Sequence, residues 1–201
     1  MTADVKTWRQ QQADATKVRI AEAARRLFAS TGYASTSISA IAHEAGVGVR
    51  TVYAVFGSKR AILSEICEAW LERAKARETA DAVLAEPDPR RRLDGAARWL
   101  ADLYSAGFDV VLILDSASDE SAETQQLLRA KRAGRDQVMS RFIRSIRDDL
   151  ILPLPEAQAM YRALAAPGVY RELVEVAGWS HDRFTQWLAT TLRRELLSGA
   201  G

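Results

Sequence analysis

Several side chains with strong hydrogen-bonding groups lie close together near the N-terminus. Arg50 carries a planar guanidinium group, Thr51 and Tyr53 add a hydroxyl and a phenol, and Lys59 adds an ammonium group. A guanidinium group can donate two hydrogen bonds at once to O6 and N7 of guanine, whereas the other three groups suit phosphate oxygens. Residues of these types at this spacing favour DNA recognition over bond-making chemistry.

Residues suited to catalysis or metal binding are sparse. The two histidines, His43 and His181, have no second ligand at metal spacing, and no nucleophile has a base near it in a known motif. The glycines of residues 46–48 do not form a dinucleotide fingerprint, because no strand precedes them. The single Cys67 cannot form an internal disulfide, and we interpret it as a buried hydrophobe. We therefore expect no enzyme, no metal site and no cofactor.

The segment that carries the hydrogen-bonding side chains has the pattern of a helix-turn-helix motif, residues 37–56. Thr36 or Ser37 caps a short helix that runs through Glu44, and a tight turn over residues 45–47 leads into a helix over residues 49–56. In this motif the second helix enters the major groove, and its first turn reaches the base edges. The predicted DNA contacts come from Thr36, Ser37, Arg50, Thr51, Tyr53, Ala54 and Lys59.

The helix over residues 49–56 must turn one side to its own core and the other side to DNA. At roughly 100° per residue, Val49, Val52 and Phe56 share one side, and we expect all three to be buried. Arg50 then lies on the opposite side, where it can read a base.

Residues 18–63 resemble, without a gap, the N-terminal domain of the tetracycline-repressor (TetR) family of regulators. The resemblance rests on the residues Phe28, Gly32, Tyr33, Thr36, Ile41, Ala42, Ala45, Gly46, Val47, Tyr53, Phe56, Ser58 and Lys59. Residues 166–197 also resemble the C-terminal end of one group within that family.

This resemblance implies an all-helical subunit with a three-helix DNA-binding head and a larger body. It implies a homodimer that binds a double-stranded, palindromic operator and acts as a repressor, the commoner outcome in the family. The body of such regulators usually holds a small ligand that releases DNA. Their last two long helices usually pack into a four-helix dimer interface.

Three residues depart from the pattern that is common in this family. Gly48 stands where serine is frequent, so the helix after it has a weaker cap. Gly57 replaces a frequent proline, and we expect a looser turn there. Val55 replaces a polar residue, commonly histidine, so that apolar contact with a thymine methyl is the expected substitute.

Large apolar side chains are spread over the predicted body helices without a cluster of charges. They predict a cavity for a small apolar or aromatic ligand, although the same side chains could form an ordinary core. The predicted ligand-binding residues are Trp70, Trp99, Tyr104, Phe108, Met139, Phe142 and Tyr161. The arginines of a long helix over residues 119–149, Arg135 among them, are interpreted as a mostly solvated face.

The segment over residues 180–197 has the most strongly amphipathic helical pattern in the chain. A soluble monomer would not leave such an apolar stripe exposed, so we expect this helix to form a two-fold dimer interface. The alternative is that the stripe covers the core of its own subunit. The predicted interface residues are Phe184, Trp187, Leu188, Thr191 and Leu192.

Helical periodicity extends over nearly the whole chain and predicts an all-α protein. The first helix is expected over about residues 14–30, and a fourth helix from about residue 58 to about residue 82. The apolar run of residues 108–114 could be a buried strand, but no partner strand is evident, and we predict a helix there.

Positive charge is concentrated in the N-terminal part of the chain. Residues 1–60 contain 9 Lys and Arg against 4 Asp and Glu, a net charge of +5, whereas the remaining residues carry −3. This asymmetry would attract a polyanion to one end of the molecule. No apolar run reaches the ~18 residues that a membrane span needs, and the N-terminus lacks an apolar signal core, so we expect a cytoplasmic protein without membrane contact.

Three segments are expected: a flexible arm over residues 1–13, a DNA-binding domain over residues 14–60, and an effector-binding and dimerisation domain over residues 61–201. The arm contains Lys6, Trp8 and Arg9 and could reach the minor groove, although a frayed terminus is the preferred interpretation. The alternative function is a helical ligand-binding or interaction protein of the same fold without specific DNA binding. The presence of Arg50, Tyr53 and Lys59 together favours DNA binding.

Overall fold

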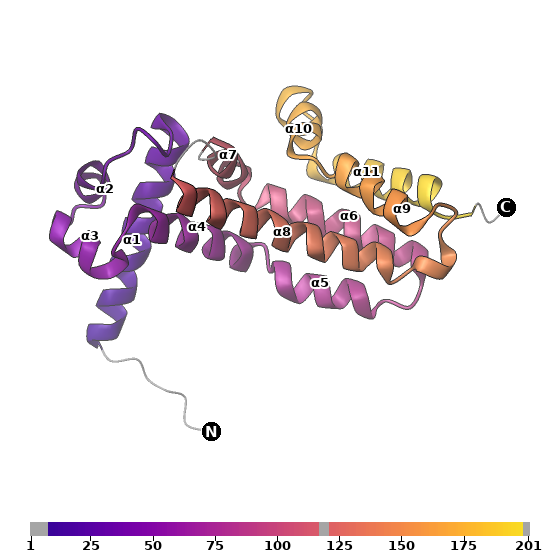
Figure 1. The fold of residues 1–201 in the computed structure, drawn as a ribbon, viewed down its shortest axis with the longest axis horizontal. Coiled ribbons are helices and arrows are strands. Elements are labelled where there is room, and N and C mark those ends of the chain that lie inside the picture. Colours follow the sequence, from indigo (N-terminus) through magenta and orange to yellow (C-terminus); the bar gives the residue numbers. More distant parts are fainter. Residues whose placement is uncertain (1–7, 117–120, 199–201) are drawn as a thin grey trace, which may run out of the picture. The chain divides into compact units, whose positions relative to one another are not determined.

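The computed structural model describes residues 8–116 and 121–198, and its regular elements are helices (Figure 1). The α-helices are α1 (Trp8–Thr31), α2 (Ile38–Glu44), α3 (Val49–Phe56), α4 (Lys59–Arg73), α5 (Ala76–Ala85), α6 (Pro89–Ser105), α7 (Phe108–Ser116), α8 (Ala122–Arg144), α9 (Leu154–Leu164), α10 (Pro167–Tyr170) and α11 (His181–Leu196). A 3-10 turn follows α8 at Arg147–Asp149, and a π-helical turn follows α10 at Arg171–Val176. The predicted all-α class is confirmed.

The predicted fourth helix is wrong in its length, because the chain breaks it into α4 and α5. The break occurs at Lys75, whose backbone has φ +48° in the left-handed region. One left-handed residue ends the regular series of backbone hydrogen bonds, and a new helix starts after it. No glycine or proline marks this position, so the sequence gives no sign of the break.

Two other predicted elements also differ at their ends. The first helix begins at Trp8 rather than at about residue 14, and Lys6 of the predicted arm lies outside the described residues. The long helix predicted over residues 119–149 ends at Arg144. The apolar run over residues 108–114 is helical, as predicted, and lies in α7.

The chain forms two compact units, one of residues 1–69 with 112–127 and the other of residues 70–111 with 128–201. In the first unit, α2 packs against both α1 and α3, the indigo to purple helices of Figure 1. The side chains buried in this part of the chain include Ile20, Phe28, Ile41, Val52 and Ile62. This core fixes the orientation of α3.

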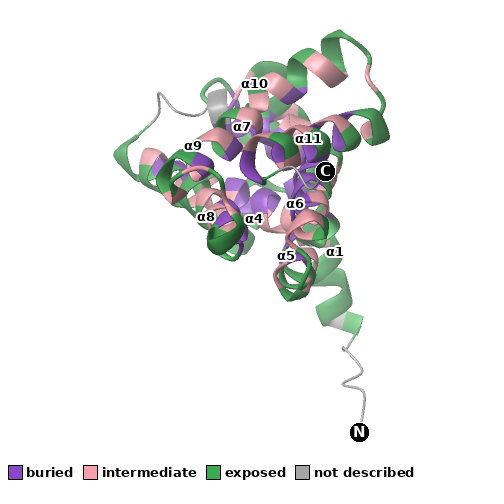
Figure 2. Cartoon of the chain, turned by 90° about the vertical axis from the view of Figure 1, so that its right-hand side faces the viewer, coloured by how far each residue is buried: buried purple, intermediate pink, exposed green. Residues whose placement is uncertain are grey.

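The second unit is built around α6, which packs against α5 and α11. The buried residues of α6 and α11 appear in purple in Figure 2. A Cβ atom at Gly95 of α6 would lie 2.9 Å from Cγ2 of Val83 in α5, so glycine is required where these two helices approach closely.

Candidate nucleic-acid interface

The turn between α2 and α3 is formed by backbone hydrogen bonds. Ser37 caps α2, because its Oγ accepts a hydrogen bond from the N–H of Ala40 at 3.1 Å. After α2, Gly46 adopts φ +63°, and the next N–H, of Val47, donates to the carbonyl of Ala42 at 3.0 Å. Gly48 caps α3 without a side-chain hydrogen bond, as the departure from serine implies.

The turn after α3 is hydrogen-bonded rather than loose, contrary to the expectation for Gly57. Gly57 has φ +71°, a conformation closed to proline, and its N–H donates to the carbonyl of Tyr53 at 2.8 Å. Ser58 then caps α4 through a 3.2 Å hydrogen bond from the N–H of Ala61 to its Oγ.

Two of the three residues predicted to face the core do so at least in part. Val52 is buried and Phe56 is half-buried, but Val49 is 40% exposed, so its predicted burial is wrong. Val49 is the first residue of α3. Helical angle alone does not bury a side chain at a helix end, since burial also needs a neighbour that covers it.

The opposite side of α3 is open to solvent. Arg50, Thr51 and Ala54 are exposed, and Tyr53 and Val55 beside them are 53% and 38% exposed. This side combines one positive charge, two hydroxyl groups and two small apolar groups. It can therefore offer hydrogen bonds and apolar contacts to a groove that admits the helix.

The hydroxyl of Thr36 does not belong to this exposed side. Thr36 is 4% exposed, its Oγ1 donates to the carbonyl of Gly32 at 2.7 Å, and the same oxygen lies 3.0 Å from Oγ1 of Thr31. The predicted phosphate contact of Thr36 is therefore wrong for this conformation, because the hydroxyl is buried and already hydrogen-bonded. Ser37 is exposed while it caps α2.

Lys59 is half-buried, and its ammonium group also bonds within the protein. Its Nζ donates to the carbonyls of Tyr33, Ala34 and Thr36. These carbonyls belong to the loop between α1 and α2, and nothing in the sequence pattern indicates this contact.

Ion pairs that the sequence analysis missed connect helices of the first unit. Arg26 of α1 donates from Nε and Nη2 to Oε1 of Glu44 in α2, at 3.1 and 3.0 Å. Lys17 of α1 lies 2.8 Å from the carboxylate of Glu65 in α4. Their partners are far apart in the sequence, so local patterns could not reveal them.

The residues predicted to bind a ligand all lie in the second unit, and most of them are buried. Phe108 is half-buried, whereas the other six form part of the core. The indole N–H of Trp70 donates to the carbonyl of Leu103 at 2.7 Å, and that of Trp99 to the carbonyl of Ala76 at 2.8 Å. Both indoles therefore have partners within the protein.

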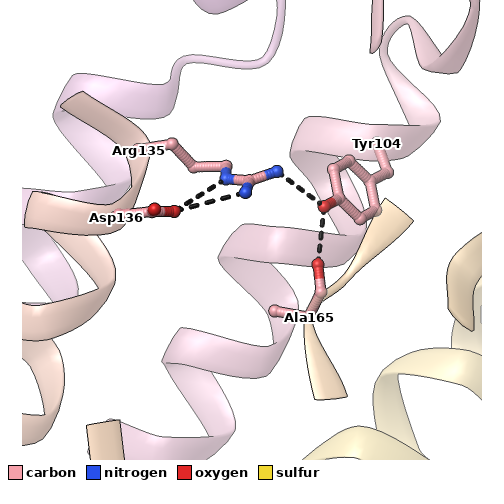
Figure 3. Close-up of polar contacts among 4 residues, drawn as sticks. All are labelled: Tyr104, Arg135, Asp136 and Ala165. Atoms are coloured by element: carbon pink, nitrogen blue, oxygen red, sulfur yellow. Dashed lines mark hydrogen bonds and ion pairs between the residues drawn. The ribbon is translucent and has the colours of Figure 1, made fainter. Parts of the chain in front are cut away.

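A polar network surrounds the phenol of Tyr104 (Figure 3). The hydroxyl of Tyr104 donates to the carbonyl of Ala165 at 2.6 Å and accepts from Nη1 of Arg135 at 3.2 Å. Arg135 also donates to Oδ1 of Asp136, at 3.3 Å from Nε and 3.2 Å from Nη2. The prediction of a solvated Arg135 is wrong. The missed signal is its spacing, because Arg135 lies seven residues after the buried Leu128 and four before the buried Met139.

Tyr104 also begins a cluster of aromatic rings. Its ring centre lies 5.7 Å from that of Phe108 and 5.1 Å from that of Tyr170, and Tyr170 lies 5.0 Å from Phe184. Burial, and to a smaller extent the charge of Glu175, raise the pKa of the Tyr170 phenol, which keeps it neutral. Tyr170 was absent from the predicted ligand-binding residues, although it lies in the segment that resembles the family.

The predicted dimer interface is only partly exposed. Phe184, Leu188 and Leu192 are buried within the chain itself, where α11 packs against α6, so these three are wrong as partner contacts in this conformation. The apolar stripe of α11 therefore covers the core of its own unit, which is the alternative to a dimer interface. Trp187 and Thr191 are half-buried and remain candidates for a contact with a second chain.

The described residues contain no group of three or more side chains placed to hold a metal ion. Within the same residues, no helix is both long enough and apolar enough to cross a membrane.

Comparison with known proteins identifies the class of this fold and site. Residues 20–66 match the family model of bacterial regulatory proteins, tetR family. The chain is 29% identical over 167 residues to the HTH-type transcriptional repressor SCO4008 of Streptomyces coelicolor, covering 83% of this chain and 79% of that protein.

Two solved structures share the fold over nearly all of the chain. A transcriptional regulator from Saccharomonospora viridis in complex with choline has a TM-score of 0.72 at 23% identity, covering 92% of this chain and 100% of the other. The regulator FadR from Bacillus subtilis in complex with stearoyl-CoA has a TM-score of 0.69 at 16% identity, covering 92% and 99%.

The exposed α3 of a helix-turn-helix, together with these matches, defines a DNA-binding transcriptional regulator. The match over residues 20–66 confirms, for this helix-turn-helix domain, the resemblance to the TetR family of bacterial regulatory proteins that the sequence indicated.

Proposed function

We propose that the protein is a cytoplasmic repressor that binds a palindromic operator as a homodimer and is not an enzyme. Residues 14–60 form its DNA-binding head, and residues 61–201 form its effector-binding and dimerisation body. The observation that carries this proposal is the division of α3 into a side anchored by Val52 and an open side that carries Arg50. Such a helix can enter a major groove without losing its packing on the head.

The open side of α3 provides both kinds of DNA contact. Arg50 lies in the first turn, where its guanidinium group can bond O6 and N7 of a guanine. Thr51, Tyr53 and Ser37 supply hydroxyl groups for phosphate oxygens and set the register of the helix. Ala54 and Val55 supply apolar surface for thymine methyl groups.

Release from DNA is proposed to follow binding of a small, mostly apolar or aromatic ligand to the second unit. The aromatic cluster of Tyr104, Phe108, Tyr170 and Phe184 supports this ligand class. Regulators of the same fold have been solved with choline and with stearoyl-CoA, which supports a ligand in the body. A ligand lowers DNA affinity only if it binds the released state more tightly than the bound state.

The experiment that tests the proposal uses the full chain and the DNA that flanks its own gene. We expect a gel shift and a footprint with two-fold symmetry, and we expect Arg50→Ala to weaken the shift. Thr79→Ala is a matched control, because Thr79 lies on α5 outside the helix-turn-helix. Absence of a specific shift from the flanking DNA and from a random-sequence selection would contradict operator binding.

A further inference from the structure

Lys59, the first residue of α4, directs its charged group into the first unit. Its Nζ donates to the carbonyl of Tyr33 at 2.8 Å and to the carbonyls of Ala34 and Thr36 at 3.3 Å each. The same nitrogen lies 4.3 Å from the centre of the Tyr33 ring. An ammonium group has three donors, so these three carbonyls use all of them.

The loop that Lys59 contacts is held from several sides. The ring of Tyr33 packs 4.9 Å from that of Phe28 in α1, and the N–H of Thr36 donates to the carbonyl of Tyr33 at 3.3 Å. The buried hydroxyl of Thr36 bonds the carbonyl of Gly32. The carbonyls of residues 33, 34 and 36 all lie within hydrogen-bonding distance of one cation, which stabilises this shape of the loop.

The loop determines where α2 begins. It ends at Ser37, which caps α2, and α2 packs directly against α3. Lys59 therefore connects the start of α4 to the position of the helix that presents Arg50.

The place of Lys59 in α4 supports the same role. A cation in the first turn of a helix faces the positive end of the helix dipole, and α4 has no acidic residue in that turn. Three carbonyl dipoles around Nζ offset this unfavourable placement.

We propose that Lys59 is a positioning residue for DNA binding. It holds the loop of residues 33–36, and through α2 it sets the position of α3, instead of neutralising a phosphate as its ammonium group alone would suggest. The effect on affinity rests on the proposed insertion of α3 into the operator, whereas the effect on the loop does not.

The first test separates the two roles by the salt dependence of operator binding. Loss of a phosphate contact makes the negative slope of log K against log salt shallower by about 0.9, and a guanidinium group would largely replace that contact. We expect instead that Lys59→Met and Lys59→Arg weaken binding to a similar extent, because a planar fork cannot reach three carbonyls grouped around one nitrogen. The slope of Lys59→Met should match that of Arg60→Met, which removes a neighbouring charge and leaves the three carbonyl contacts intact.

The second test uses the same variants without DNA. Amide hydrogen exchange at Ala40 and Ile41, in the first turn of α2, should be about ten-fold faster in Lys59→Met and Lys59→Arg, equivalent to one hydrogen bond to a charged group. Arg60→Met should exchange at the wild-type rate. Unchanged exchange in both Lys59 variants overturns the proposal, and so does a salt slope for Lys59→Met that is shallower than that of Arg60→Met by about 0.9. If the wild-type protein binds no operator, the proposed function fails, and the exchange experiment still decides whether Lys59 holds the loop.

Discussion

Arg50 is the only charged side chain of α3 and lies on its exposed side. Replacing it with alanine should reduce operator affinity by roughly 1 to 3 kcal/mol, because a bidentate contact to guanine is lost. Arg50→Ala should also lose the base preference of the wild type at one symmetric pair of operator positions and keep it elsewhere. Binding to a set of single-base operator variants measures this preference. Equal weakening on every variant would instead indicate a phosphate contact.

Val55 provides an apolar group beside the exposed side of α3, and it is 38% exposed. If it contacts a thymine methyl, replacing that thymine with uracil should reduce wild-type affinity about four-fold, the effect of about 0.8 kcal/mol for one buried carbon. Fluorescence anisotropy with operators that carry uracil at single positions measures this effect.

The Val55→Ala variant is the control for this experiment. It should bind the thymine operator more weakly and lose little more when uracil replaces the contacted thymine. A wild-type protein that does not distinguish thymine from uracil at any position would show that Val55 does not read a methyl group.

The sequence indicated which side of α3 is exposed, because Arg50 and Val52 differ in polarity and lie on opposite sides of a helix. It did not indicate the directions of Thr36 and Lys59. Both side chains can bond either phosphate or a backbone carbonyl, and the nearest acceptors come from a loop whose shape depends on tertiary packing. For Arg135 the spacing indicated the inner side of α8, but the partner Tyr104 lies on another helix and could not be predicted from the sequence.

At the scale of elements, local sequence signals were sufficient to predict the start of a helix where a side chain at that start caps it. Ser37, one of the two caps predicted for α2, accepts a backbone hydrogen bond at the start of that helix, and Ser180 does the same for α11. The break at Lys75 has no comparable local signal, because lysine rarely adopts a positive φ. Its conformation depends on the packing around it rather than on residue type.

Asp88 provides a cap for α6 that depends on pH. Its Oδ1 accepts hydrogen bonds from the backbone N–H groups of Arg91 at 3.0 Å and Arg90 at 2.7 Å. The bond from Arg91 is the main cause that lowers the pKa of this carboxyl below its ordinary 3.8, and the bond from Arg90 and both arginine charges add to it. Because the folded pKa is the lower one, the stabilisation is present above the ordinary value and is lost as pH falls through the lowered value.

We expect Asp88→Asn to keep the cap but remove its dependence on pH. Thermal unfolding midpoints of the variant and wild type, followed from about pH 7 to about pH 3, should converge at the acid end of the range. Asp81→Asn, an exposed residue of α5, is the control and should follow the wild-type profile. Parallel profiles for Asp88→Asn and wild type would show that this cap does not titrate with folding.

At the scale of the whole molecule, the proposed homodimer depends on Trp187 rather than on the buried stripe of α11. Trp187 is half-buried and packs against Trp179 and Phe184, with ring centres 6.1 and 5.7 Å apart. Trp187→Glu should shift the protein to monomer in sedimentation at low concentration, because a charge would enter an apolar contact. A dimer that persists in this variant would place the interface elsewhere.

Two variants on the same helix support the interpretation of that experiment. Gln186→Glu adds the same charge at an exposed position and should remain a dimer. Leu188→Glu should fail to fold rather than dissociate, because it would bury an unpaired carboxylate against α6. Circular dichroism separates loss of fold from loss of association.

The buried indoles described above also give the protein an intrinsic optical probe. Of its five tryptophans, Trp70, Trp99, Trp179 and Trp187 lie in the second unit, and only the exposed Trp8 lies in the first. A Trp8→Phe variant would therefore emit tryptophan fluorescence only from the unit that carries the proposed ligand-binding residues. A ligand that lowers the affinity for DNA must itself bind more weakly when DNA is bound. If ligand binding and DNA binding are linked in this way, adding operator to the protein should change this emission.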